Sequence, residues 1–389
     1  MRLAAPEVVD RLSVDYLLWN AYVDGRLCAL ADPVRVPRRD LEEVAGLSER
    51  FAARLERTVD LVLADPALLA SYGFPPALAR MLGVPRPARH VTLARYDAFR
   101  TPDGWRFCEF NADVPGGIHE GAGLADLVLG DASSFRVVPL LTDSLCADTA
   151  RPVVAVCYAS GFGEDLEQCQ FLRRAWSRQG LEAILCSPRN LEFDGRRLRA
   201  FGVPVDVVYR FFPGEWLPDV PNAEAIHAAV RSGAVRLINS MTSLVAQSKR
   251  TMALWHERPD LLTADERDLV LRCLPRTETF RLAEMDRYRR DRERLVVKRC
   301  FGRVGEEVLM GAMCGDAEWA DWLGWPASEP GAWIVQERFE VLAEDVGGDR
   351  LHACFGPYVV DGRFGGFYTR LSPDAFIGFN ALIGAVGAT

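Results

Sequence analysis

Apolar and polar positions repeat with two different periods along the chain, and the change of period marks its first predicted boundary. Across residues 7–82 apolar positions recur at helical spacing, most clearly over 41–63, so we expect this segment to be mostly helical. Over 91–97 apolar and polar positions alternate as in a strand, a turn follows at 101–104, and residues 105–110 alternate again. The pattern therefore predicts helices first and a β-hairpin after them.

The rest of the chain divides into a segment where strands alternate with helices and a segment dominated by strands. The alternation over 152–238 favours a parallel sheet. Residues 240–292 return to helical spacing, and from Arg294 onward strand patterns dominate, interrupted by one helical stretch at 316–325. With boundaries near 150 and 240 we expect three parts, namely 1–150 with the helices and the hairpin, 151–240 with the parallel sheet, and 241–389.

Composition and charge narrow the class of protein. The chain of 389 residues is 49% apolar and has a net charge of −8 without a basic block, which argues against a nucleic-acid binder. No run of about 18 apolar residues occurs, so we expect no membrane span, and no apolar signal core follows Met1. None of the ten cysteines forms a Cys-x-x-Cys pair, so a disulfide scaffold is not expected. These features predict a soluble, cytoplasmic protein.

Lysine is almost absent, and the two positions where it occurs are informative. Of the 46 basic residues, only Lys249 and Lys298 are lysines. Lys249 stands at the start of an apparent helix, and Lys298 closes an apolar run before a glycine-containing loop at 302–305. The compact charge of lysine suits a phosphate oxygen in a narrow slot, whereas arginine is a wide planar fork. Two surface lysines could persist by chance, but the strand and loop beside Lys298 favour a nucleotide-phosphate site.

The predicted hairpin carries the densest group of chemically useful side chains. Residues two apart on a strand point to the same face, so Arg95 and Asp97 share a face, as do Glu109 and Asn111. In register, the hairpin would bring three oxygen-bearing side chains and one guanidinium together, which suits Mg²⁺. A solvated face with an incidental salt bridge would show the same alternation. The aromatic side chains expected to wall the opposite face are Tyr96, Phe107 and Phe110.

The segment after the hairpin adds candidate anion and substrate contacts. Two adjacent glycines, Gly116 and Gly117, offer backbone N–H groups to an anion. Glu120 is a candidate for holding a positively charged substrate group, although an acid at a helix N-terminus would have the same pattern. His119 is interpreted as a polar loop residue because no second histidine lies near it in the sequence.

Taken in order, these residues resemble the circularly permuted ATP-grasp ligases of the glutathionylspermidine synthetase type. The resemblance rests on Arg95-x-Asp97, Glu109-x-Asn111-Ala112-Asp113, Ile238-Asn239 leading to Lys249, Val296-Val297-Lys298 with the loop from Gly302 to Gly305, Trp333-Ile334-Val335-Gln336-Glu337, and Gly356-Pro357-Tyr358 leading through Gly365-Gly366 to Arg370. In ordinary ATP-grasp enzymes the metal-binding acid and asparagine follow the nucleotide-binding lysines. Here they precede the lysines, as in the permuted group.

The resemblance implies a role for each motif. Lys249 and Lys298 would hold ATP phosphates, with Lys298 nearer the α- and β-phosphates. Arg95 and Arg370 would stabilise charge on the transferred phosphoryl group. The residues implied to hold two Mg²⁺ ions are Asp97, Glu109 and Asn111. The residues implied to cover or contact the nucleotide are Gly302, Arg303, Gly305, Gln336 and Glu337.

The same resemblance implies the fold and the reaction. The implied fold is an α/β (α+β) ATP-grasp fold, circularly permuted, with an N-terminal helical segment and an inserted parallel-sheet subdomain of the pre-ATP-grasp type. In the implied reaction, ATP converts a carboxylate into an acyl phosphate and an amine displaces the phosphate. Glutathionylspermidine synthetases hold glutathione with small hydroxyl residues, but this chain has Val114 and Gly116 there, so glutathione and spermidine are not the expected substrates. The candidate substrate contacts are Asp113, Glu120, Arg210 and Glu215, of which the last two could instead form a buried ion pair.

The sequence is compatible with several functions. A phosphotransferase would stop at a phosphorylated product, and a nucleotide-binding regulator would lack turnover. A Rossmann-type oxidoreductase built on 152–238 matches less well, because the loop 159–164 has a Gly-x-Gly without the third glycine. The leading hypothesis is a carboxylate–amine (or carboxylate–thiol) ligase that uses ATP and Mg²⁺ on small molecules. A homodimer is the commonest oligomeric state for such a protein.

Overall fold

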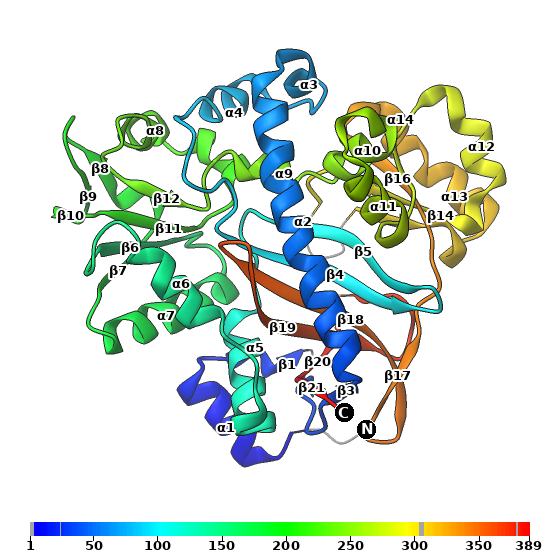
Figure 1. Ribbon diagram of the computed structural model, residues 1–389, viewed down its shortest axis with the longest axis horizontal. Helices are drawn as coiled ribbons and strands as arrows, with labels where there is room; N and C mark the ends of the chain where they lie inside the picture. The colour runs from blue at the N-terminus through cyan, green and yellow to red at the C-terminus, as the bar shows by residue number, and fades with distance from the viewer. Residues whose placement is uncertain (1–3, 24, 303–306, 379) are drawn as a thin grey trace.

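Three larger sheets, each with its own helices, make up a mixed α/β fold (Figure 1). The computed structural model describes residues 4–23, 25–302, 307–378 and 380–389. The central sheet has the strand order β20-β19-β18-β4-β5, with β17 paired to β18. Its strands are β4 (Leu93–Thr101), β5 (Gly104–Asn111), β17 (Ala343–Val346), β18 (Asp349–Val360), β19 (Arg363–Ser372) and β20 (Leu382–Gly384). The predicted hairpin is therefore confirmed, and it lies in one sheet with strands from the end of the chain.

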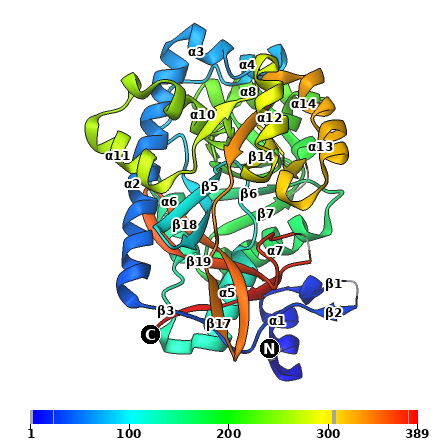
Figure 2. The same cartoon turned by 90° about the vertical axis from the view of Figure 1, so that its right-hand side faces the viewer.

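Helix α2 (Arg38–Ala64) covers one face of the central sheet (Figures 1 and 2). Phe51 of α2 packs against Phe107 and Phe110 of β5, with ring centroids 4.9 and 5.1 Å apart. Tyr96 of β4 meets Phe110 edge-on, with ring centroids 4.9 Å apart. The aromatic wall expected on this face is confirmed, so the polar residues of β4 and β5 point to the other side of the sheet.

The second sheet is antiparallel, with the order β13-β16-β14-β15. Its strands are β13 (Thr277–Thr279), β14 (Leu295–Arg299), β15 (Val308–Met310) and β16 (Trp333–Glu337). A buried cluster that includes Phe280, Tyr288 and Trp319 packs against it. The helices of this lobe are α10 (Arg250–Glu257), α11 (Ala264–Cys273), α12 (Met285–Arg290), α13 (Asp316–Trp322) and α14 (Gly324–Ser328). Strand β13 was not expected within 240–292, because three residues are too few to show a period and its strand character comes from pairing with β16.

The third sheet is parallel throughout, with the order β12-β11-β6-β7, as the alternation of strands and helices predicted. Its strands are β6 (Val153–Tyr158), β7 (Glu182–Cys186), β11 (Val207–Phe211) and β12 (Arg236–Ile238), and its helices are α7 (Gly163–Arg178) and α8 (Ala223–Arg231). A small antiparallel sheet of β8 (Leu191–Phe193), β9 (Leu198–Ala200) and β10 (Val203–Pro204) lies beside it. These strands all fall within the segment predicted as a separate part.

The expectation that residues 7–82 are mostly helical is confirmed, although the described part of this segment also contains strands that were not predicted. Three short strands occur there, and β3 (Val34–Val36) pairs in parallel with β21 (Val386–Ala388) near the other end of the chain. A strand whose partner is more than 300 residues away has no local signal. The remaining elements are α1 (Pro6–Asp15), β1 (Tyr22–Val23), β2 (Arg26–Leu27), α3 (Pro66–Ala70), α4 (Pro76–Met81), α5 (Ile118–Leu124), α6 (Val137–Leu145) and α9 (Ser243–Gln247). Within the described ranges, no helix combines the length and apolar character that crossing a bilayer requires.

Candidate active site

The polar face of the β4–β5 hairpin gathers the predicted carboxylates and amide. Arg95 lies opposite Asn111, and Asp97 lies opposite Glu109, so the two polar faces meet as the sequence suggested, by means of a register shift between Asp97 and Ala98. The Asn111 side-chain amide donates a hydrogen bond of 3.3 Å to Asp97 Oδ1. These oxygen atoms come from two paired strands, which hold them at a fixed separation.

Two arginines flank Asp97. Arg370 of β19 donates to Asp97 Oδ2 at 2.9 Å, and Arg95 Nη2 lies 3.8 Å from Asp97 Oδ1. Strand β18 separates β19 from β4 in the sheet, so Arg370 reaches across β18 to meet Asp97. Burial by itself lowers the pKa of the Arg370 guanidinium, but the Asp97 carboxylate, together with Cys354 and Tyr368, outweighs burial and raises it. Both arginines therefore carry full positive charge beside the carboxylates.

Both lysines reach this hairpin, although each is more than 130 residues away from it in the sequence. Lys249, between α9 and α10, places Nζ 2.9 Å from Glu109 Oε1 and donates to the Gly302 carbonyl at 3.1 Å. Lys298 of β14 donates to the side-chain oxygen of Gln336 at 2.8 Å and to the Cys108 carbonyl at 3.4 Å. The two amines thus contact consecutive residues of β5. Both lysines are buried.

The two lysines differ in what balances their charge. Lys249 is paired with the carboxylate of Glu109, whereas Lys298 has only the neutral oxygens of Gln336 and Cys108 within hydrogen-bond distance among the residues that the structure describes. A buried ammonium without a counter-charge is costly, and such groups usually meet an anion. Lys298 is therefore the place in this cluster where an added anion would bring the largest electrostatic gain.

Strand β16 carries Gln336 and Glu337, two of the residues that the resemblance implies contact the nucleotide. Gln336 is buried, and its amide donates to Thr277 Oγ1 at 3.1 Å, which ties β16 to β13. Glu337 is exposed and lines a cavity of about 600 Å³ together with Phe339 and Arg106. Of the predicted loop, Gly302 accepts the bond from Lys249. The predicted contacts Arg303 and Gly305 lie outside the described residues.

Of the two glycines after the hairpin, Gly116 is held through its carbonyl oxygen, whereas the sequence had suggested a role for the N–H groups of both. The Gly116 carbonyl accepts hydrogen bonds from Arg95, at 2.8 Å, and from the Tyr358 hydroxyl. Gly117 has a φ of +90°, and a Cβ there would lie 2.7 Å from the ring of Tyr368. A side chain at Gly117 would therefore collide with the sheet as well as strain the backbone.

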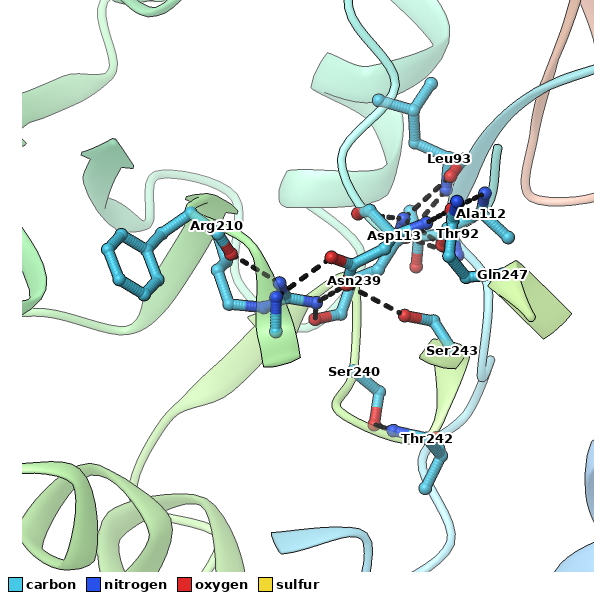
Figure 3. A network of polar contacts seen from close by, with 12 residues as sticks. Thr92, Leu93, Ala112, Asp113, Arg210, Asn239, Ser240, Thr242, Ser243 and Gln247 are labelled. Atoms are coloured by element: carbon cyan, nitrogen blue, oxygen red, sulfur yellow. Dashed lines mark hydrogen bonds and ion pairs between the residues drawn. The ribbon is translucent and has the colours of Figure 1, made fainter. Parts of the chain in front are cut away.

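The candidate substrate residues Asp113 and Arg210 instead contact each other (Figure 3). Arg210 pairs with Asp113 Oδ1, and the backbone N–H of Gly214 donates to Asp113 Oδ2 at 2.9 Å. Arg210 and Asp113 thus form an ion pair, and their side chains are 2% and 0% exposed. Their main effect is to join the loop after β5 to the end of β11.

Asn239 holds both strands of the hairpin at their open end (Figure 3). Its side-chain oxygen accepts from the backbone N–H groups of Thr92 and Leu93, each at 2.9 Å. Its amide donates to the carbonyls of Leu93, Ala112 and Asp113 at 2.7 to 3.0 Å. Sequence reasoning noted Asn239 only as part of a motif and missed this positioning role, because all of its partners are more than 120 residues away.

Glu120 has a partner that the sequence did not suggest. His119, expected as a polar loop residue, lies buried in α5 with Nδ1 2.8 Å from Glu120 Oε2 and Nε2 3.6 Å from Glu167 Oε2. Burial by itself lowers the pKa of His119, but the Glu120 and Glu167 carboxylates outweigh it and raise the pKa to about 9. Glu120 is therefore largely neutralised by a cationic histidine.

Comparison with known proteins agrees with this arrangement. Residues 30–378 match the family described as glutathionylspermidine synthase pre-ATP-grasp. The chain belongs to the glutathionylspermidine synthase pre-ATP-grasp family. Comparison with curated protein sequences gives no significant match. Every candidate site residue from Arg95 to Arg370 lies inside the segment that this family covers.

One solved structure shows the same fold as this family member. A glutathione synthetase-like effector from Globodera pallida, in its apo form, aligns over 100% of both chains with a TM-score of 0.63 and 9% identity. A putative gamma-glutamylcysteine synthetase from Methylobacillus flagellatus aligns over 87% of this chain and 85% of its own, with a TM-score of 0.47 and 13% identity. The second likeness is too weak to carry an argument. The first shows the fold alone.

Proposed function

We propose that this chain is an ATP- and Mg²⁺-dependent ligase that joins a carboxylate to an amine and releases ADP and phosphate. The observation that carries the proposal is the meeting of Lys249, Lys298 and the oxygen donors of the β4–β5 hairpin on one face of the central sheet. Membership in a family of pre-ATP-grasp synthases supports the same reaction class. On this proposal the fold is a circularly permuted ATP-grasp fold, since the hairpin precedes the lysines in sequence.

The donor set fits a nucleotide and hard metal ions. Lys298 lacks a protein carboxylate partner within the described ranges, so a phosphate oxygen would complete its surroundings. Asp97, Glu109 and Asn111 would supply oxygen ligands of the kind that Mg²⁺ takes alongside phosphate oxygens. No group of three or more His, Cys, Asp and Glu residues suited to a metal occurs among the described residues, and this donor set includes an amide in place of a third acid. Bound Mg²⁺ would offset the negative charge of the triphosphate.

The residues present act by positioning and by charge. In the first step a carboxylate oxygen of the substrate attacks the γ-phosphorus, the bond to the ADP oxygen breaks, and an acyl phosphate forms. Arg95 and Arg370, both beside Asp97, would stabilise the charge on the transferred phosphoryl group. In the second step the amine nitrogen attacks the acyl carbon, inorganic phosphate leaves, and the amine gives up a proton. This sequence requires no nucleophilic side chain from the protein.

A ligase and a phosphotransferase make different products, so one experiment separates these two functions. The protein is incubated with Mg²⁺, ATP and paired panels of small carboxylates and amines, and ADP release is followed together with the masses of the products. A ligase forms ADP in proportion to a new amide and needs both substrates. A phosphotransferase forms ADP without the amine and leaves a stable phosphorylated compound. ATP binding without any ADP release would leave a nucleotide-binding protein and overturn the proposal.

A further inference from the structure

A second cavity lies at the carboxyl ends of the strands in the parallel sheet. Its volume is about 240 Å³, and the residues around it follow β6, β7 and β11 in the chain. Strand β6 lies between β11 and β7, so the chain leaves β6 toward β7 on one side and later returns on the other side as β11. Parallel sheets bind ligands outside their carboxyl ends at such switch points.

Two aromatic side chains line this cavity, and a third stacks on one of them. Phe212 and Trp216 line it. Phe162 stacks on Trp216, with ring centroids 5.7 Å apart and planes 26° from parallel, while Phe212 meets Trp216 edge-on at 6.1 Å. Phe162 and Trp216 nevertheless remain 53% and 38% exposed. Neighbouring large rings that stay this exposed at the rim of a cavity are typical of a site that binds another apolar or aromatic group.

A short series of contacts connects this cavity to the reactive face of the central sheet. Trp216 lies two residues after Gly214, whose N–H is bonded to Asp113 in the loop that follows β5. Three residues further along that loop, the Gly116 carbonyl accepts the hydrogen bond from Arg95. A molecule in the cavity would thus lie next to the loop that borders the candidate phosphoryl-transfer site.

We propose that this cavity holds the aromatic side chain of one substrate, so that the enzyme joins an aromatic amino acid or a short peptide that carries one. This inference rests on the proposed ligase function. The volume suits a single ring system rather than a larger ligand. Arg189 and Asp219 bring one charge of each sign to the lining, which fits a zwitterionic amino acid and opposes a polycation.

Variants at the exposed rings test this inference without disturbing the core. We expect L-phenylalanine or L-tryptophan to support ADP release better than L-alanine or L-lysine, each tested both as acid and as amine. Trp216→Ala should lower kcat/KM for the aromatic substrate about tenfold and leave the KM for ATP unchanged. Phe162→Ala should act in the same direction. Trp325→Ala, which removes a ring that is 56% exposed on α14, is the matched control and should change neither parameter.

A direct binding measurement tests the aromatic pocket independently of the proposed ligase function. Calorimetric titration with L-phenylalanine and L-tryptophan is carried out on the wild type and on Trp216→Ala, without ATP. If no pair of carboxylate and amine, with or without an amino acid, supports ADP release but the wild type binds an aromatic amino acid and Trp216→Ala does not, the proposed ligase function fails and the pocket stands. ADP release with no aromatic preference, a preference for L-lysine, or equal aromatic binding by both proteins would overturn the pocket assignment. The absence of binding below a Kd of about 1 mM in the wild type would also overturn it.

Discussion

Replacing Lys298 by methionine tests the charge argument most directly. Methionine keeps much of the length and apolar volume of the lysine stem but removes the ammonium of a residue that is only 7% exposed. The lost contacts are two hydrogen bonds to neutral oxygens, on Gln336 and Cys108. The lost charge is one that no described carboxylate balances. Stability and activity should therefore respond differently to the substitution.

The expected magnitudes follow from these contacts. Loss of a preorganised cation at a phosphoryl-transfer site costs about 3–4 kcal/mol of transition-state stabilisation, or about 100- to 1,000-fold in turnover. For the fold, two lost hydrogen bonds and the removal of an unpaired buried charge act in opposite directions, so the free energy of unfolding should change by less than about 2 kcal/mol. Lys249→Met differs because it leaves Glu109 without its partner. That variant should lose about 2–3 kcal/mol, less than a fully buried pair would lose, since Glu109 is 18% exposed.

The assay does not require knowledge of the substrates. Urea unfolding followed by tryptophan fluorescence is measured with and without Mg²⁺ and ATP. At a ligand concentration of about 100 times Kd, the wild type should gain about 2.7 kcal/mol of stability, and Lys298→Met should lose most of this gain at the same concentration. If Lys298→Met is stabilised by ATP as much as the wild type is, Lys298 does not hold the nucleotide and the reasoning from its neutral surroundings is wrong.

Three further predictions concern neighbouring groups. Glu109→Gln should reduce ADP release at least about 100-fold while circular dichroism shows a folded protein, and full activity would exclude Glu109 as a metal ligand. Asn239→Ala leaves five backbone groups without their partner and should lower the free energy of unfolding by at least about 4 kcal/mol in urea titrations; a loss below about 1 kcal/mol would contradict its positioning role. Because the pKa of His119 is raised to about 9, its pairing with Glu120 and Glu167 stabilises the fold most below about pH 6.5, the unfolded pKa, and is lost as the pH rises toward 9. Wild-type stability should fall by about 3 kcal/mol over this range relative to His119→Gln, and parallel pH profiles would refute the assignment.

The elements that the sequence predicted well are those with a local period. The β4–β5 hairpin and the side chains that alternate along each strand follow from a local period on each side of one turn. The register shift between Asp97 and Ala98, which puts Asp97 opposite Glu109 and lets both Phe107 and Phe110 contact Phe51, does not follow from alternation. The parallel sheet follows from strands that alternate with helices. Strands β3 and β13, of three residues each, were missed because their pairing partners lie elsewhere in the chain and no period develops over so short a length.

The candidate site also has features that the sequence predicted and features that it did not. Residue type singled out Lys249 and Lys298, since lysine occurs nowhere else in the chain. Residue type did not reveal that Lys249 is balanced by Glu109 whereas Lys298 is not. It also did not show that Asp113 and Arg210 pair with each other, so two candidate substrate contacts are better explained as supports of a loop.

The sequence by itself determined which chemical groups this protein possesses and which of them share a strand face, because side-chain direction along a strand is set by backbone geometry over two residues. The tertiary structure alone decided which charges meet. Asp97 faces Arg370 and Glu109 faces Lys249, across 273 and 140 positions, and Lys298 faces neutral oxygens that lie 38 and 190 positions away. Such pairings depend on how sheets and helices pack in three dimensions. The local sequence around a residue does not indicate which distant residue it will meet.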